Sequence, residues 1–184
     1  MTWIDWLAVG LVVGYALGGF ITGVFRRLLG MVAVPIAFLA ATNMGLQAGL
    51  ILQQSSNFDL PDARIYGFFG IATVVLVIVE GATQLGNSQL QVPALVLNRT
   101  LGVIVGTFTG ILLTVIVVYE LGAAGNPVGG SQLDVTQQRI RDAYNNSHVA
   151  VPLVGKVSKQ FITILQPVLP NDPQIYFGPS PVNP

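Results

Sequence analysis

Long runs of apolar residues alternate with short polar connectors over the first two thirds of this chain. A helix needs about 20 residues to cross the hydrocarbon core of a bilayer, and four of the runs reach that length. They cover residues 3–25, 28–52, 65–85 and 101–121. The pattern predicts an all-α fold, in which residues 1–122 form a bundle of four transmembrane helices.

The pattern changes after the fourth run. Residues 123–130 are rich in glycine and include a proline, which predicts a hinge. Residues 131–168 predict short amphipathic helices on the extracytoplasmic side, lying at the membrane interface, because apolar residues on one face of the second helix oppose lysines on the other. Residues 169–184 are rich in proline, and we expect them to form an extended tail.

Small residues recur at every fourth position in three of the runs. At 100° per residue such positions stay on one helical face, and in lipid this face lets another helix backbone approach closely. We therefore expect glycine-rich interfaces of the glycine-zipper type within the bundle, the alternative being that one stripe serves an oligomer or a partner subunit. The predicted packing residues are Gly10, Gly14, Gly18, Gly19, Gly23, Ala33, Ala37, Ala41, Gly45, Gly102, Gly106 and Gly110.

The composition agrees with a membrane protein and excludes several kinds of chemistry. Hydrophobic residues make up 52% of the chain and charged residues only 9%, against about 25% charged in an ordinary soluble domain. The eight basic and eight acidic residues cancel, so no positive field attracts nucleic acid. With no cysteine and the single histidine His148, a Cys- or His-rich metal site within one chain is excluded. We identify no catalytic residue, cofactor, metal or small-molecule substrate, and expect no enzymatic activity.

Polar residues inside the third run are the candidates for intramembrane chemistry. Thr73, Glu80 and Gln84 fall within about 40° of one another around a helix. An acid inside a span is costly and marks a functional candidate, here a proton or cation site carried by Glu80. The alternative, which we favour, is that Glu80 reaches headgroup water or pairs with Arg99.

Residues typical of membrane interfaces flank the runs. The expected membrane anchors are Trp3, Trp6, Arg26, Arg27 and Arg99. We also expect Asp5, between two tryptophans, and Glu120, at the end of a run, to lie at the interface. Three arginines in the first and third connectors, against one in the second, place those connectors in the cytoplasm. Both termini are therefore predicted to be extracytoplasmic.

Two glycine-rich motifs resemble a known family. Residues 18–27 read Gly-Gly-Phe-Ile-Thr-Gly-Val-Phe-Arg-Arg, and residues 97–106 read Leu-Asn-Arg-Thr-Leu-Gly-Val-Ile-Val-Gly. They resemble the colicin V production (CvpA) family, which has Gly-Phe-x-x-Gly before basic residues in the first helix and Leu-Asp-Arg-x-x-Gly-x-x-x-Gly at the fourth. Ser147 and Pro152 resemble the family's short Ser/Pro segment. Asn98 stands where the family usually has Asp.

The resemblance implies a bacterial protein of the cytoplasmic (inner) membrane, linked to toxin export and envelope homeostasis. The first hypothesis is therefore a non-enzymatic scaffold or assembly factor, whose partners are the lipid bilayer and other membrane subunits or further copies of itself. An accessory subunit of a larger respiratory or photosynthetic complex is the alternative. A small transporter that uses Glu80 is less favoured. Some relatives carry a serine protease after the same four helices, but we expect no protease activity here.

Overall fold

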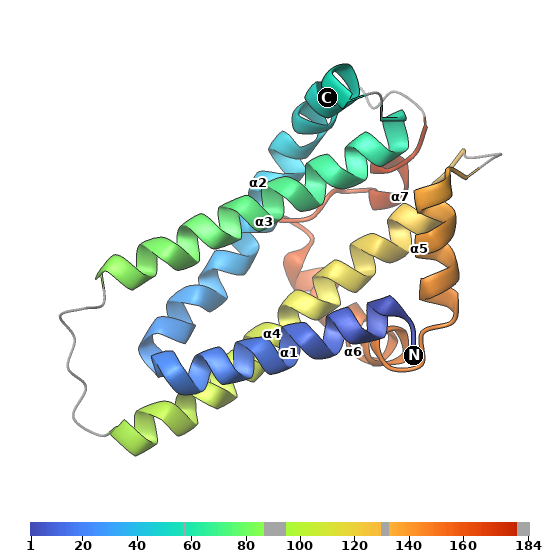
Figure 1. Ribbon diagram of the computed structural model, residues 1–184. Coiled ribbons are helices and arrows are strands. Elements are labelled where there is room, and N and C mark those ends of the chain that lie inside the picture. Colours follow the sequence, from blue (N-terminus) through green and yellow to red (C-terminus); the bar gives the residue numbers. More distant parts are fainter. Residues whose placement is uncertain (57, 87–94, 130–132, 180–184) are drawn as a thin grey trace.

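The computed structural model describes residues 1–56, 58–86, 95–129 and 133–179. Within these ranges it consists of seven helices and contains no strand (Figure 1). The helices are α1 (Trp3–Thr22), α2 (Val24–Ser56), α3 (Leu60–Gly86), α4 (Leu95–Gly125), α5 (Val135–Asn145), α6 (Ala150–Leu165) and α7 (Pro173–Tyr176). The predicted all-α fold is confirmed.

Helices α1 to α4 are long and apolar enough to cross a membrane, with mean hydropathies between 1.8 and 2.5. Large apolar side chains point outward along all four, including Ile21, Ile51, Val77 and Ile104. A soluble monomer rarely exposes apolar surface on this scale. The chain is thus a multi-pass membrane protein, as the four apolar runs predicted.

Three of the spanning helices are longer than the runs that predicted them, including α3, which extends beyond residues 65–85 at both ends. α2 begins before residue 28 and ends after residue 52, and α4 extends beyond residues 101–121 at both ends. The first three residues of the hinge expected at 123–130 therefore belong to α4, and residue 130 lies outside the described residues. Gly125 ends α4 and packs closely on α5, where an added Cβ atom would lie 3.0 Å from the Arg141 backbone nitrogen.

Helices α1 and α4 lie side by side and antiparallel, in close contact along their glycines (Figure 1). A Cβ atom added at Gly19 would collide with the Gly102 carbonyl, and one added at Gly102 would collide with the Gly19 carbonyl. One turn further along α4, a Cβ atom at Gly106 would collide with the Tyr15 carbonyl, and Gly110 is crowded in the same way. The two backbones approach so closely that a larger residue would push them apart.

Helices α2 and α3 form the second antiparallel pair. The small residues of α2 that are fully buried include Ala33, Ala37 and Ala41. A Cβ atom added at Gly45 would lie 3.0 Å from the Phe68 Cα atom, and one added at Gly49 would lie 2.8 Å from the Ala63 carbonyl oxygen. Gly49 was not among the predicted packing residues, yet it is as crowded as its neighbour one turn away.

The structure corrects the prediction at two glycines of α1. Gly10 and Gly14 are exposed, and a Cβ atom added at either would have no neighbour within 4 Å. Gly10 lies about 180° around the helix from Gly19. Of the two opposed glycine stripes on α1, only the stripe that contains Gly19 packs on α4, so the other one faces away.

Two further glycines of the first motif lie beside polar side chains. The Arg27 guanidinium lies directly against Gly18, where a Cβ atom would collide with it. Gly23 connects α1 to α2 with φ of 81°, a backbone conformation that residues with a Cβ atom rarely adopt. The Asn98 side chain lies against Gly23 and leaves no room for a larger residue there.

The segment after α4 packs against the spanning helices. α6 lies along α4, and the Phe161 ring centroid is 6.0 Å from that of Phe108, near the middle of α4. The predicted amphipathic helix thus forms, and it packs along α4 within the described fold. The cause is its apolar face, which packs on α4 through residues such as Val154 and Leu165, both buried.

The expected extended tail is folded over its described part, residues 169–179. α7 forms within it, and the rings of Tyr176 and Phe177 each lie 5.5 Å from that of Phe68. Arg64 donates hydrogen bonds to two carbonyls of this segment. Aromatic burial and these hydrogen bonds outweigh the preference of the prolines for extended chain. Residues 180–184 lie outside the described residues.

We expect Gly106→Leu to lower the free energy of unfolding by about 1–3 kcal/mol, because the new side chain must displace the α1 backbone. The matched control is Gly14→Leu, which we expect to change stability little, since its side chain extends into open space. Thermal unfolding of both variants in mild detergent measures the difference. Equal effects of the two substitutions would contradict the packing described for α1 and α4.

Candidate functional site

The two family-like motifs meet where α1 turns into α2 beside the start of α4. The Asn98 side-chain oxygen accepts a hydrogen bond of 3.0 Å from the Val24 backbone N–H. That N–H is one of the free donors that every helix has at its first turn. An amide oxygen can accept this hydrogen bond as a carboxylate oxygen would, so the cap does not need a charge at position 98. The motifs thus fix the corner between the first two spanning helices.

Arg27 turns back toward the bundle from this corner. Its guanidinium lies 5.0 Å from the centre of the Tyr15 ring and 3.6 Å from the Glu80 carboxylate. Glu80 therefore pairs with Arg27 and not with Arg99, which lies 5.6 Å from the centre of the Phe20 ring. Arg27, expected as a membrane anchor, instead ties α2 to α3, while Trp3 and Trp6 remain exposed as an aromatic belt requires.

The predicted intramembrane polar site is not assembled in the described residues. Thr73 is exposed and donates a 2.8 Å hydrogen bond to the Phe69 carbonyl of its own helix. Glu80 lies two turns away beside Arg27. The side chain of Gln84 lies outside the described residues. Of the two described side chains, Glu80 contacts a charged group and Thr73 does not.

Asp5 is fully buried and accepts hydrogen bonds from the start of α6. The Ser147 hydroxyl donates to it at 2.5 Å, and the backbone N–H groups of Val149 and Ala150 donate at 3.1 and 3.0 Å. A carboxylate is favoured at a helix N-terminus, where free N–H groups and the helix dipole meet it. We had expected Asp5 at the open interface, but α6 covers it.

Asp5, Ser147 and His148 are neighbours, but they do not form a catalytic triad. In a triad the imidazole lies between the hydroxyl and the carboxylate. Here the Ser147 hydroxyl bonds directly to Asp5, and His148 reaches Asp5 only through its backbone N–H, at 3.3 Å. The cluster anchors α6 to α1, and it has no geometry for nucleophilic catalysis.

Glu120 is fully buried near the end of α4. Neither carboxylate oxygen has a hydrogen-bond partner among the described residues. Its nearest ionisable neighbours include Tyr119 on the same helix and Tyr176 on α7. Burial and then the Glu120 carboxyl raise the pKa of Tyr176 above its usual range. Burying a carboxyl group without a hydrogen-bond partner is energetically unfavourable, so Glu120 lowers the stability of the bundle.

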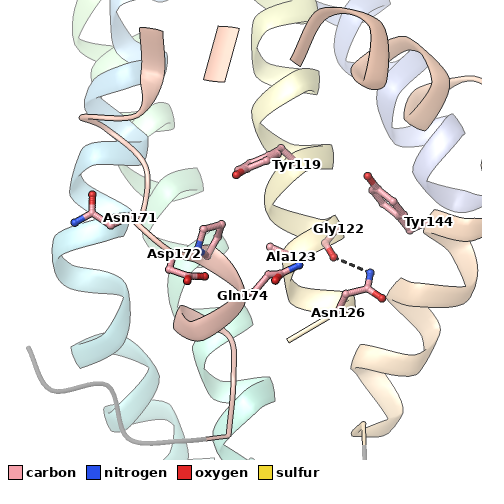
Figure 2. Close-up of a pocket in the computed structure, with 9 residues that line it drawn as sticks. Tyr119, Gly122, Ala123, Asn126, Tyr144, Asn171, Asp172 and Gln174 are labelled. Atoms are coloured by element: carbon pink, nitrogen blue, oxygen red, sulfur yellow. Dashed lines mark hydrogen bonds between the residues drawn. The ribbon is translucent and has the colours of Figure 1, made fainter. Parts of the chain in front are cut away.

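A polar pocket opens at the end of α4, next to Tyr119, the residue before Glu120, and it is bordered by the last turn of α5 and by the start of α7. Figure 2 shows it between the last turns of α4, α5 and the segment that leads into α7. Its volume is about 430 Å³, within the range of small-molecule sites. It is lined by Tyr119, Gly122, Ala123, Asn126, Tyr144, Asn171, Asp172, Pro173 and Gln174.

The polar groups of this pocket are phenols, amides and one carboxylate. Asp172 is the one charged residue that lines it, and it also accepts a 3.3 Å hydrogen bond from the Ile175 backbone N–H at the start of α7. Burial raises the pKa of Tyr144 above its usual range, so its phenol stays neutral and can donate. The Asn126 amide donates to the Gly122 carbonyl at 3.0 Å. This set can recognise a polar or cationic group, but it lacks a general base next to a nucleophile.

Metal chemistry receives no support from the described part of the chain. No group of three or more His, Cys, Asp or Glu side chains gathers there in a way that could hold an ion. The carboxylates are instead distributed among separate tasks, with Asp5 at α6, Glu80 at Arg27 and Asp172 at α7.

Comparison with known proteins gives one result. The family model described as "Colicin V production protein" matches residues 4–157. This match confirms the resemblance inferred from the two glycine-rich motifs and covers all four spanning helices, α5 and half of α6. No curated protein and no solved structure matches the chain.

Sequence reasoning missed the burial of Asp5, Glu120 and the C-terminal aromatic residues. The signals were weak but present. Asp5 interrupts an otherwise apolar run, and adjacent aromatic residues at Tyr176 and Phe177 are unusual in a segment expected to be extended and solvated. Neither signal shows which segments bury these residues, because α6 and α7 come from the far end of the sequence.

We expect Glu120→Met to raise the free energy of unfolding by about 1–3 kcal/mol, because it removes a buried polar group that makes no hydrogen bond and fills a similar volume. Chemical unfolding in detergent measures the change, with Glu80→Met as the control that should destabilise by breaking the pair with Arg27. A loss of stability in Glu120→Met would show that the carboxyl has a partner after all.

Proposed function

Because this chain belongs to the colicin V production protein family, we propose that it is a non-enzymatic scaffold or assembly factor of the bacterial cytoplasmic membrane. In this role it supports toxin export or another envelope process by holding membrane partners together. Its own chemistry is recognition, through the polar pocket at the end of α4 and through the lipid-facing surfaces of the bundle.

The observation that supports this proposal is the use of the polar side chains. Asp5 holds α6 to α1, Asn98 caps α2, and Arg27 pairs with Glu80 between α2 and α3. Each of these groups forms its hydrogen bonds or its ion pair with another part of the same chain. Such a distribution favours a rigid platform over an enzyme, whose reactive groups must converge on a substrate.

The orientation of the platform remains a proposal drawn from the arginines. Arg26, Arg27 and Arg99 lie at the end of the bundle where α1 meets α2 and α4 begins, opposite the end that carries the N-terminus, α5 and α7 (Figure 1). If the arginine-rich end faces the cytoplasm, the polar pocket faces the periplasmic side. Both termini of the described chain then lie on that side.

The two alternatives receive less support. A transporter would need Glu80 free to load and release a cation, whereas Arg27 lies 3.6 Å from it. An accessory subunit is compatible with the fold. However, the C-terminal segment packs on its own bundle through Tyr176 and Phe177, so its order requires no partner.

The proposal predicts that the protein extracted from native membranes with mild detergent sediments as part of a larger assembly. It also predicts that proteoliposomes carrying the parent chain conduct protons no faster than protein-free liposomes, because Arg27 holds the Glu80 carboxylate. A density gradient and a pH-sensitive dye inside the vesicles measure the two properties.

The two measurements separate the scaffold and the accessory subunit, which both predict a larger assembly, from the transporter. A lone monomer in the gradient would contradict the scaffold. Proton flux that exceeds the protein-free background and falls in Glu80→Gln would favour the transporter instead.

A further inference from the structure

An apolar crevice lies between α1 and α3, two helices that make little or no contact with each other. It consists of two adjoining cavities of about 400 and 310 Å³. The cavities share Trp3, Phe69 and Leu121 in their linings, so they lie next to each other. Its walls are almost entirely apolar.

The crevice runs from the end of the bundle that carries α5 toward the middle of the membrane. On α1 it extends from Trp3 to Leu11, and on α3 from Ile65 to Leu76. At a rise of about 1.5 Å per residue these stretches are about 12 and 16 Å long. One leaflet of the hydrocarbon core is about 15 Å thick, half of the full core. The crevice therefore has the depth of a single leaflet.

Two exposed glycines of α1, Gly10 and Gly14, lie near the crevice, although neither of them lines it. Gly10 and Gly14 lie within about 60° of Leu7 around the helix, and Leu7 lines the crevice. Neither glycine has a neighbour within 4 Å of an added Cβ atom, so α1 presents no side chain at these two positions between the crevice and the surrounding bilayer.

The end of the crevice nearest α5 is lined by a cationic side chain. Arg139 of α5 lines it together with Thr136, Tyr66 and Trp3. Arg139 is exposed and has no ion pair or hydrogen bond within the described part of the chain. A guanidinium binds phosphate oxygens in a planar, bidentate geometry, and tryptophan and tyrosine favour the level of the headgroups.

We propose that this crevice binds a phospholipid of the bilayer, with its phosphate at Arg139 and one acyl chain between α1 and α3. The Arg139 guanidinium matches the phosphate of such a lipid, and the apolar walls match its acyl chain. The length of the crevice matches the thickness of the leaflet that holds the lipid. A transmembrane helix of a partner protein would need no cation at this position, and it is the occupant that the test must exclude. The inference goes beyond the scaffold role and does not depend on it.

The first test uses native mass spectrometry of the purified full chain with an equimolar mixture of phosphatidylglycerol and diacylglycerol that carry the same acyl chains. We expect the parent to retain phosphatidylglycerol about five-fold over diacylglycerol, the effect of one interfacial arginine on an anionic headgroup. Arg139→Gln should bring the ratio close to one. Arg141→Gln, on the same helix but outside the crevice, should leave it unchanged. An unchanged ratio in Arg139→Gln would overturn the proposal.

The second test fills the acyl-chain part of the crevice. Thr73 lines the crevice but is exposed, so Thr73→Trp can place its ring there without disturbing the buried core. We expect it to lower the retention of both lipids several-fold, whereas Val74→Trp, on the neighbouring exposed position outside the crevice, should not. Equal retention in the two variants would overturn the proposal. So would a polypeptide, rather than a lipid, as the species that Thr73→Trp displaces.

Discussion

Van der Waals contact between the backbones of α1 and α4 is the interaction on which the rest of the structure depends. In lipid, apolar side chains gain nothing by leaving their surroundings, so helices associate through close packing and hydrogen bonds. Gly19 and Gly102 allow each backbone to touch the carbonyl of the other. This crossing places Asn98 against Gly23 and the first turn of α2, and it directs the other end of α1 toward α6.

Polar side chains complete the fold because an unpaired polar group in the membrane is costly. Buried Asp5 accepts hydrogen bonds from the N-terminus of α6. Arg27 pairs with Glu80 of α3 and lies over the Tyr15 ring of α1, and these contacts hold α2 against both helices. Glu120 is the exception, since it is buried without a partner in the described residues. It lies where the C-terminal segment folds over α4, and its neighbour Tyr119 lines the polar pocket. The unfavourable free energy of burying this carboxyl therefore arises at the same end of the bundle as the pocket.

The sequence predicted the features that depend on composition and missed those that depend on long-range docking. Four spans follow from the length of the apolar runs, and the family follows from local motifs. Spacing shows which glycines share a face, but it cannot tell which of two opposed faces meets a neighbour, and so Gly10 and Gly19 were treated alike. The sequence offered Arg99 or headgroup water for Glu80 and missed Arg27, because both arginines lie at the same end of the bundle and spacing along the chain does not show which one turns toward α3. The burial of Asp5 and Glu120 depends on α6 and α7, whose docking no local pattern encodes.

A double-mutant cycle at Gly19 and Gly102 tests the central contact most directly. The free energy of unfolding is measured for the parent, Gly19→Ala, Gly102→Ala and the double variant under identical lipid conditions. If the two backbones touch, either alanine alone separates the helices, and the double variant loses less stability than the sum of the single losses by at least about 0.5 kcal/mol. Losses that add to within about 0.3 kcal/mol would mean that the two glycines do not face each other.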